Sequence, residues 1–221
     1  IGFSAGELDT TSLLAFAGAG DAFVKTWYDQ ASTNDATQTT TASQPQIVSS
    51  GAVIVENGKP AVSFSSDRLY AVGMAGTNMS DQSTFTVAKG TSGYRVVGSI
   101  SNDYLAANRA LWVGSDTTSQ FGNAAYNGTL VFGGSVTSQF LGSLIGVDGG
   151  NITSYVDGSQ VAQSLAGTYT SSTSGLSVGM DFSSSQYSWL GRIQEIVVYA
   201  SDQSTNRTNI ESNVNTFYSI Y

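Results

Sequence analysis

The sequence predicts an all-β fold, a two-sheet antiparallel jelly-roll sandwich with a short C-terminal helix. Short runs of β-branched and aromatic residues recur along the chain with turn residues between them, as in Gly191–Tyr199. Hydrophobic residues make up 40% of the chain, enough to fill a core between two sheets. Sandwiches of 221 residues commonly form one unit, so we expect a single domain over 1–221.

The expected elements begin with a capped helix over Glu7–Gly18. Phe23–Gln30 is predicted as a strand that directs Trp27 or Tyr28 into the core, and a polar loop follows. Two turns that tolerate positive φ, Asn57-Gly58 and Asp157-Gly158, predict β-hairpins. Further strands are expected at Ile47–Val48, Val53–Val55, Pro60–Phe64, Ser83–Lys89, Tyr94–Ser99, Ala110–Val113, Leu130–Phe132, Phe140–Val147, Ile152–Val156, Ser159–Ser164, Gly175–Met180 and Trp189–Tyr199.

A last helix is expected after Ser201-Asp202, which could cap it. Ile210, Val214 and Phe217 would form one apolar stripe on this helix. Its other residues are mostly Asn, Ser and Thr, which have poor helix propensity. The helix would therefore depend on docking that stripe against the sandwich.

The charge of the chain excludes one class of partner. Eight basic residues stand against sixteen acidic ones, and a net charge of −8 repels phosphate backbones, so no nucleic acid is expected. No apolar run approaches the roughly 18 residues of a membrane span, so we expect no membrane insertion. The first residue is Ile1, which suggests a longer or processed precursor.

Several segments resemble the concanavalin A-like lectin/glucanase superfamily, and within it the laminin-G-like jelly-roll modules of bacteria and tailed phages. In place of the Ser-Gly-Asn-Gly-like turn usual in that family, this chain has Ala31-Ser32-Thr33. The resemblance implies a sandwich and an extracellular location, on a phage virion or a bacterial cell surface. The segments are Thr26–Gln30, Asn34–Gln38, Gly58–Phe64, Tyr155–Val161 and Gly191–Tyr199, with Asp202-Gln203 and Asn206-Arg207.

The residue types restrict catalysis. With no histidine and no cysteine, neither Ser-His-Asp nor Cys-His catalysis is available. Glycoside hydrolysis typically needs two carboxylates. Asp181 resembles the acid/base of the superfamily's arabinofuranosidase branch, but Arg109–Val113 offers no glutamate as its partner. Glu195 is interpreted as a structural carboxylate paired with Arg192 or a backbone amide. We therefore predict that the chain is not an enzyme.

Aromatic residues in polar stretches are the candidate ligand-binding residues, because sugars stack on aromatic rings and bond to nearby amides. Trp27 and Trp189 are expected in the core, and Trp112 and Tyr126 are open to either interpretation. The candidates are Tyr104, Trp112, Tyr126 and Tyr187.

A cation is the one cofactor that the sequence suggests. Asp148 and Asn151 flank two glycines and offer oxygen ligands on a flexible turn, as calcium prefers. An Asx-type turn explains the same residues equally well.

The sequence therefore predicts a non-enzymatic recognition module that binds a glycan or another cell-surface ligand. The alternative is a structural virion protein, a capsid decoration or fibre component, that makes only protein–protein contacts with virion neighbours or in a homo-oligomer. Exposed edge strands would suit that role. A glycoside hydrolase is the third hypothesis.

Overall fold

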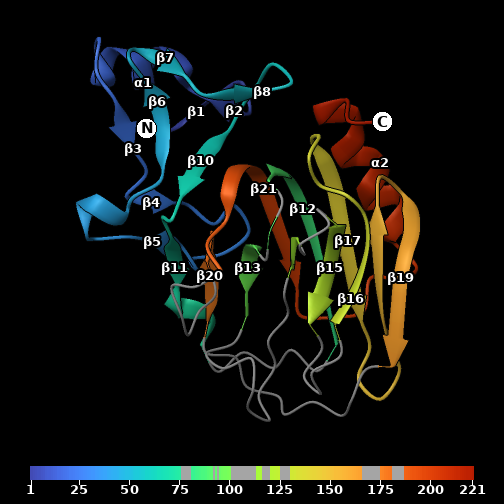
Figure 1. Ribbon diagram of the computed structural model, residues 1–221. Coiled ribbons are helices and arrows are strands. Elements are labelled where there is room, and N and C mark those ends of the chain that lie inside the picture. Colours follow the sequence, from blue (N-terminus) through green and yellow to red (C-terminus); the bar gives the residue numbers. More distant parts are fainter. Residues whose placement is uncertain are drawn as a thin grey trace.

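The computed structural model describes residues 1–75, 81–91, 93, 95–100, 113–115, 120–124, 130–165, 175–180 and 187–221. Two antiparallel β-sheets pack face to face, and a C-terminal helix lies on the outer face of one of them (Figure 1). The predicted fold class, an all-β two-sheet sandwich with a short C-terminal helix, is confirmed.

The sheet that carries the C-terminal helix has the strand order β19-β18-β17-β12-β21-β10-β6-β3, with β7 paired to β6. We call it the helix-side sheet. Its strands are β3 (Ala22–Phe23), β6 (Gln46–Ser49), β7 (Ala52–Val53), β10 (Val62–Ser65), β12 (Gln82–Gly90), β17 (Phe140–Gly146), β18 (Asn151–Val156), β19 (Ser159–Leu165) and β21 (Leu190–Tyr199).

The second sheet, which we call the facing sheet, has the order β16-β15-β14-β13-β20-β11-β5-β4. Its strands are β4 (Thr26–Trp27), β5 (Ala36–Thr37), β11 (Leu69–Ala71), β13 (Arg95–Ser99), β14 (Val113–Ser115), β15 (Gln120–Ala124), β16 (Leu130–Ser135) and β20 (Leu176–Val178).

Two small hairpins and short helices complete the described parts of the chain. The remaining elements are β1 (Phe3–Ser4), β2 (Glu7–Leu8), β8 (Val55–Glu56) and β9 (Lys59–Pro60), the α-helices α1 (Thr10–Ala17) and α2 (Arg207–Tyr218), and the 3-10 helices η1 (Thr41–Ser43) and η2 (Val72–Met74). Of the helices in these described parts, none is long and apolar enough to cross a membrane.

The core lies between the two sheets. Trp189 and Phe140 are fully buried at its centre, with their ring centroids 6.5 Å apart. Phe121 of the facing sheet reaches across to Phe140 at 5.4 Å. Gly142 permits this contact, because a Cβ atom there would lie 2.4 Å from the Phe121 ring. Side chains from both layers thus interlock at close to van der Waals distance.

A β-bulge in β21 explains its apolar pattern. Val87 of β12 pairs with Glu195, whereas its neighbour Ala88 pairs with Ile193, so Gln194 is the extra residue. Ile193 and Ile196 therefore both face the core although they lie three positions apart. Glu195 falls on the outer face, under α2.

The predicted strand Phe23–Gln30 is wrong in its extent. The chain crosses from one layer to the other within it, since β3 belongs to the helix-side sheet and β4 to the facing sheet. Trp27 packs against the core, whereas Tyr28 is 55% exposed. Residue composition does not reveal this crossing, because the residues on both sides of it favour β-strands.

The C-terminal helix forms as predicted, with two corrections. It begins after Asn206, so Ser201-Asp202 does not cap it. Val214 and Tyr218 are buried against the sheet, whereas Phe217 is 43% exposed. Tyr218 takes the predicted place of Phe217, because positions four and eight residues after Ile210 share one helix face.

Candidate ligand-binding site

Several described strands of the facing sheet end at one level of the sandwich. By register, Ser99 at the end of β13 pairs with Ser177 near the start of β20, and Ala71 at the end of β11 pairs with Leu176. β15 runs parallel to β13 through their shared neighbour β14, so Ala124 ends at the same level. We call this level, in the lower half of Figure 1, the loop end.

Three of the four predicted aromatic residues, Tyr104, Trp112 and Tyr126, lie outside the described residues, as does Asp181. The described strand residues next to Trp112 and Tyr126, Val113 and Ala124, both lie at the loop end.

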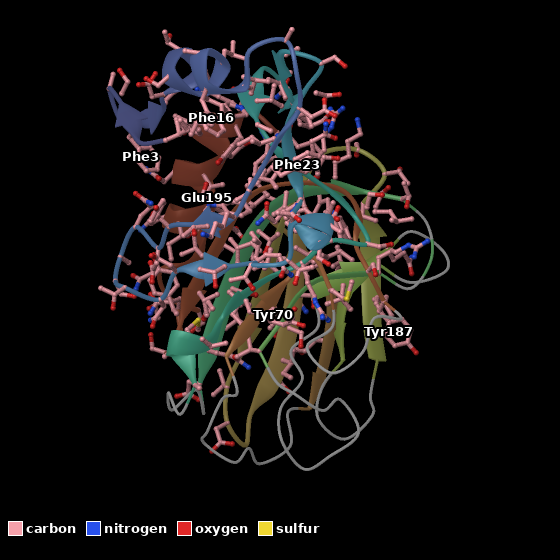
Figure 2. All side chains as sticks on the ribbon, turned by 90° about the vertical axis from the view of Figure 1, so that its left-hand side faces the viewer. Phe3, Phe16, Phe23, Tyr70, Tyr187 and Glu195 are labelled. Carbon is pink, nitrogen blue, oxygen red and sulfur yellow. The ribbon has the colours of Figure 1, made fainter. Side chains whose placement is uncertain are left out.

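Tyr187 is described and lies elsewhere (Figure 2). Its carbonyl accepts a hydrogen bond of 2.9 Å from the backbone of Val96. Val96 precedes Ser99 by three residues, roughly 10 Å along a strand. Tyr187 is therefore set back from the strand ends that flank Trp112 and Tyr126. Trp189, expected in the core, is buried there.

Asp148 and Asn151 belong to the turn between β17 and β18. The Val147 amide donates to the Asn151 carbonyl at 3.1 Å, and Gly149 takes a φ of +65°. The backbone N–H of Asp148 donates to the Asp81 carboxylate at 2.8 Å. Within the described ranges no three His, Cys, Asp or Glu side chains gather as metal ligands. Both residues thus lie in one hairpin turn.

Glu195 does not pair with Arg192, one of the two partners predicted for it. Arg192 pairs with Glu56 at 2.8 Å instead. The Tyr218 hydroxyl lies beside the Glu195 carboxylate and donates to the Gln194 carbonyl at 3.5 Å. Burial raises the pKa of Glu195, and the neighbouring Tyr218 hydroxyl partly offsets this. The carboxylate faces the docked helix α2, which is consistent with a structural role.

The loop between β4 and β5, residues 28–35, is a candidate site that the sequence reasoning missed. The register of β5 against β11 places Ala36 level with Ala71, so this loop lies at the loop end. Its Tyr28 ring is exposed. A Cβ atom on Gly73 would lie 2.7 Å from the side-chain oxygen of Asn34, so the loop packs closely on η2. The exposed tyrosine before an acidic and amide-rich run was the available signal.

Hydrogen bonds within the loop fix its shape. The Asp29 amide donates to the Asp35 carboxylate, and the Ala31 amide donates to the Asp29 carboxylate, both at 2.9 Å. The Ser32 hydroxyl also donates to Asp29. These bonds stabilise the charged form, so the pKa of Asp29 lies below its ordinary value, with the Ser32 bond as the largest cause. Tyr28 is therefore carried by a loop whose backbone is held by these hydrogen bonds.

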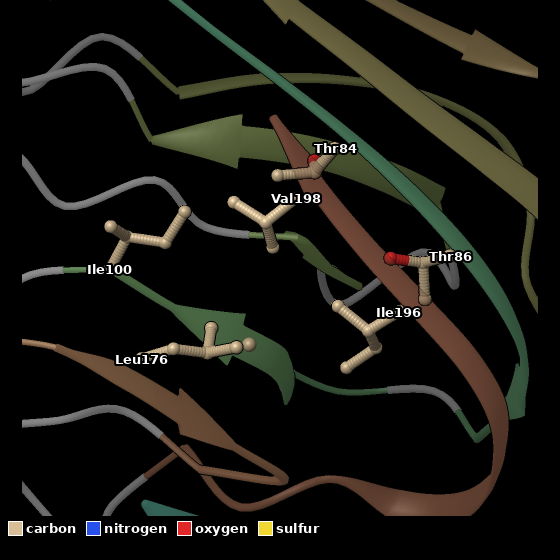
Figure 3. Close-up of a pocket in the computed structure, with 7 residues that line it drawn as sticks. Thr84, Thr86, Ile100, Leu176, Ile196 and Val198 are labelled. Atoms are coloured by element: carbon tan, nitrogen blue, oxygen red, sulfur yellow. The ribbon is translucent and has the colours of Figure 1, made fainter. Parts of the chain in front are cut away.

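An internal cavity lies between the sheets at the same level (Figure 3). Its volume is about 10 Å³, and Ile100, Leu176 and Val198 form much of its wall. Thr84 also lines it, and its buried hydroxyl has no hydrogen-bond partner within the described residues. A space of this size holds one water molecule at most, so a sugar would bind the surface loops and not this cavity.

No family model and no curated protein matches this chain. Solved structures do. A mutant GH54 α-L-arabinofuranosidase soaked with 4-nitrophenyl α-L-arabinofuranoside matches 93% of this chain and 53% of its own at 15% identity, with a TM-score of 0.67. Trypanosoma rangeli sialidase matches 90% of this chain and 31% of its own at 13% identity, with a TM-score of 0.57.

NanB, a sialidase from Streptococcus pneumoniae, matches 68% of this chain in its structure with Optactamide, at 13% identity and a TM-score of 0.51. The chain spans 27% of that NanB structure, so it corresponds to about a quarter to a half of the solved structures named here. At these identities the likeness shows the fold alone.

These similarities correct one prediction. The chain was predicted not to be an enzyme, and this is contradicted, because the similar structures are glycoside hydrolases. The partner of Asp181 was expected in Arg109–Val113, which contains no glutamate. Of these five residues the structure describes Val113 alone. What the comparisons support is an all-β sandwich of a kind found in proteins that act on glycans.

Proposed function

We propose that this chain is a glycan-recognition module of the concanavalin A-like, laminin-G-like type, and that it binds neutral sugars at the loop end through Tyr28. The observation that carries the proposal is an exposed aromatic ring on a loop fixed by its own carboxylates. Aromatic faces stack on the apolar faces of sugar rings. A loop that is ordered before binding loses little conformational entropy when the ligand arrives.

The polar groups around Tyr28 suit sugar hydroxyls. Gln30 is exposed, and its amide nitrogen donates to the Tyr28 backbone carbonyl at 2.9 Å, which holds this side chain close to the Tyr28 backbone. Asn34 and the two loop aspartates add further amide and carboxylate oxygens. Residues 28–35 contain no lysine or arginine, and the chain carries a net charge of −8. This charge favours neutral glycans over acidic ones such as sialosides.

The other predicted residues enter the proposal as follows. Trp112, Tyr126, Tyr104 and Tyr187 would also bind the ligand, and Asp148 and Asn151 would hold calcium. We propose an extracellular setting, on a phage particle or bacterial surface, as one domain of a larger protein. A structural virion role, with contacts only to virion neighbours or other copies, is the alternative.

A glycan array tests the proposal. The chain should bind neutral arabinose-, galactose- or glucose-containing glycans, and Tyr28→Ala should lose most of that signal. Phe16→Ala is the matched control, since Phe16 is an exposed aromatic residue on α1, in the upper part of Figure 2. Equal loss in both variants, or no binding to any glycan, would contradict a Tyr28 site.

Glycoside hydrolysis is the second candidate, favoured by the fold shared with the arabinofuranosidase and sialidases. A screen with 4-nitrophenyl α-L-arabinofuranoside and a fluorogenic sialoside would detect it. If turnover occurs, Asp29→Asn, Asp35→Asn and Asp181→Asn identify the carboxylates responsible. Glu195→Gln serves as the control, because that carboxylate faces α2 and should leave turnover unchanged. Absence of turnover on both substrates would leave recognition as the function.

A further inference from the structure

A groove lies apart from the loop end, between the β1–β2 hairpin with α1 and the strands β7 and β8, in the upper left of Figure 1. Its volume is about 540 Å³, within the range of ligand-binding pockets. Leu8, Leu14 and Val53 line it, and their side chains pack on the small core around Leu13 and Val48. The groove therefore has a rigid apolar floor.

Strand β2 pairs with β1 alone among the described strands, so its other edge has no strand partner there. The β1–β2 hairpin closes over Ala5-Gly6, both with positive φ, and pairs Phe3 with Leu8. The Asp9 amide donates to the Gly2 carbonyl at 3.0 Å. Because hydrogen-bonded and non-hydrogen-bonded pairs alternate in an antiparallel ladder, the next pair inward is non-hydrogen-bonded. The N–H and C=O of Leu8 therefore point away from β1.

Strand β7 also has an outward edge, on the side away from β6. Its hairpin with β6 closes over Ser50-Gly51, again with positive φ, and pairs Val48 with Val53. The Ile54 amide donates to the Ile47 carbonyl at 2.9 Å, so the Val48–Val53 pair is non-hydrogen-bonded. The N–H and C=O of Val53 point away from β6. Two strand edges with outward backbone groups thus line one groove.

The groove has one ionisable lining residue among those described, and that residue is already in an ion pair. It is Glu7, whose side chain is 48% exposed. One of its oxygens contacts the Lys59 ammonium at 2.9 Å, while that ammonium also lies 3.9 Å from the centre of the Phe217 ring. Because a carboxylate has two oxygens and the Glu7 side chain is half-exposed, Glu7 can accept from a second ammonium or guanidinium group as well.

We propose that this groove binds an extended peptide segment of a partner protein as an added β-strand. One peptide residue exchanges two backbone hydrogen bonds with Val53, and the next residue exchanges two with Leu8, since successive residues of a strand bond to opposite sides. Apolar peptide side chains pack on the floor, and a lysine or arginine lies against Glu7. The site is independent of the Tyr28 loop.

The test titrates the protein with an acetylated, amidated peptide of alternating valine and threonine that ends in lysine. Binding is followed by fluorescence anisotropy and by amide hydrogen exchange. The amides of Leu8 and Val53 should become protected by about tenfold or more at saturation, as expected for a newly formed backbone hydrogen bond. A peptide N-methylated at the two central residues should lose binding.

Two variants sharpen the result. Glu7→Gln should weaken binding of the lysine peptide by about two- to fivefold and leave a lysine-free peptide unaffected. Val53→Pro removes the outward donor without removing a bond from the β6–β7 ladder, and should abolish peptide binding while the circular dichroism spectrum is kept. Three outcomes would overturn the proposal: unchanged binding of the N-methylated peptide, no protection of either amide, or protection that already arises from self-association without peptide.

Discussion

The hydroxyl of Tyr218, near the end of α2, lies beside the carboxylate of Glu195 on the outer face of β21 and donates to the Gln194 carbonyl at 3.5 Å. The phenol and the carboxyl group both lose water on docking, and burial is the main reason that both pKa values are raised. The Asn57 side chain fixes the same helix end by donating to the Tyr218 carbonyl at 2.8 Å. The helix is thus held by polar contacts as well as by its apolar stripe.

The Glu195 contact predicts a pH-dependent stability difference. The pKa of Glu195 in the fold lies above its ordinary value of 4.5. Between these two values the folded state holds a proton that the unfolded state lacks, so this group's contribution to stability falls as pH rises through that window. Glu195→Gln should therefore gain stability relative to the native chain between pH 4 and pH 8.

Urea unfolding at both pH values measures this difference. Asp67 and Asp157 also have raised pKa values, but they are present in both proteins and cancel in the comparison. A difference between Glu195→Gln and the native chain that does not change with pH would show that Glu195 is not desolvated by the helix.

The ion pair of Arg207 and Glu211 within α2 predicts an asymmetric response to mutation. The Glu211 side chain is 3% exposed, and Arg207 also lies 3.9 Å from the centre of the Tyr155 ring. Arg207→Met leaves a buried carboxylate without its partner and should cost about 3–5 kcal/mol of unfolding free energy. The double variant with Glu211→Leu should recover most of that loss in a denaturant melt. Additive losses would contradict a buried pair.

Close packing at Gly90 predicts a sharp steric effect. A Cβ atom there would lie 2.5 Å from the Trp189 ring, which is fully buried. Gly90→Ala should destabilise the fold by about 1–3 kcal/mol. Gly2→Ala, whose Cβ would meet nothing within 4 Å, should change stability by less than about 0.5 kcal/mol. Thermal melts of the two variants check this, and equal effects would place Trp189 elsewhere.

The Asp29 hydrogen bonds predict a loss of glycan affinity without unfolding. Asp29→Asn removes the charge to which Ser32 donates and should loosen the loop that carries Tyr28. Affinity for a neutral glycan should fall by about three- to tenfold, consistent with the loss of one or two charge-assisted hydrogen bonds. The melting temperature should remain close to that of the native chain. A large drop in melting temperature would instead show that Asp29 stabilises the fold as a whole and not only the binding loop.

Local patterns predicted the hairpins and the first helix because their causes are local. Asn57-Gly58 and Asp157-Gly158 adopt the positive φ angles that their turns require. Asp9 caps α1 by accepting from the Ser12 amide. The crossing from the helix-side sheet to the facing sheet between Phe23 and Thr26 was not predicted. It depends on which sheet each strand joins, and the local sequence does not show this. The bulge at Gln194 was missed for the same reason.

The candidate site was harder to predict than the fold. The strand pattern left either Trp27 or Tyr28 to face the core, because neighbouring residues on a strand point to opposite faces. Trp27 was expected in the core, but Tyr28 was not singled out as a ligand-binding residue. Sequence reasoning also paired Glu195 with Arg192 or a backbone amide, although Glu56 from a distant hairpin takes that arginine. Contacts between residues far apart in sequence set both outcomes.

Isothermal titration of a neutral oligosaccharide into the native chain, Tyr28→Ala and Phe16→Ala tests the proposed function most directly. The oligosaccharide would be the strongest binder from the array. Loss of one stacked aromatic ring should weaken binding by at least about tenfold in Tyr28→Ala, while Phe16→Ala binds as the native chain does. Equal affinity of all three proteins would contradict recognition at the Tyr28 loop.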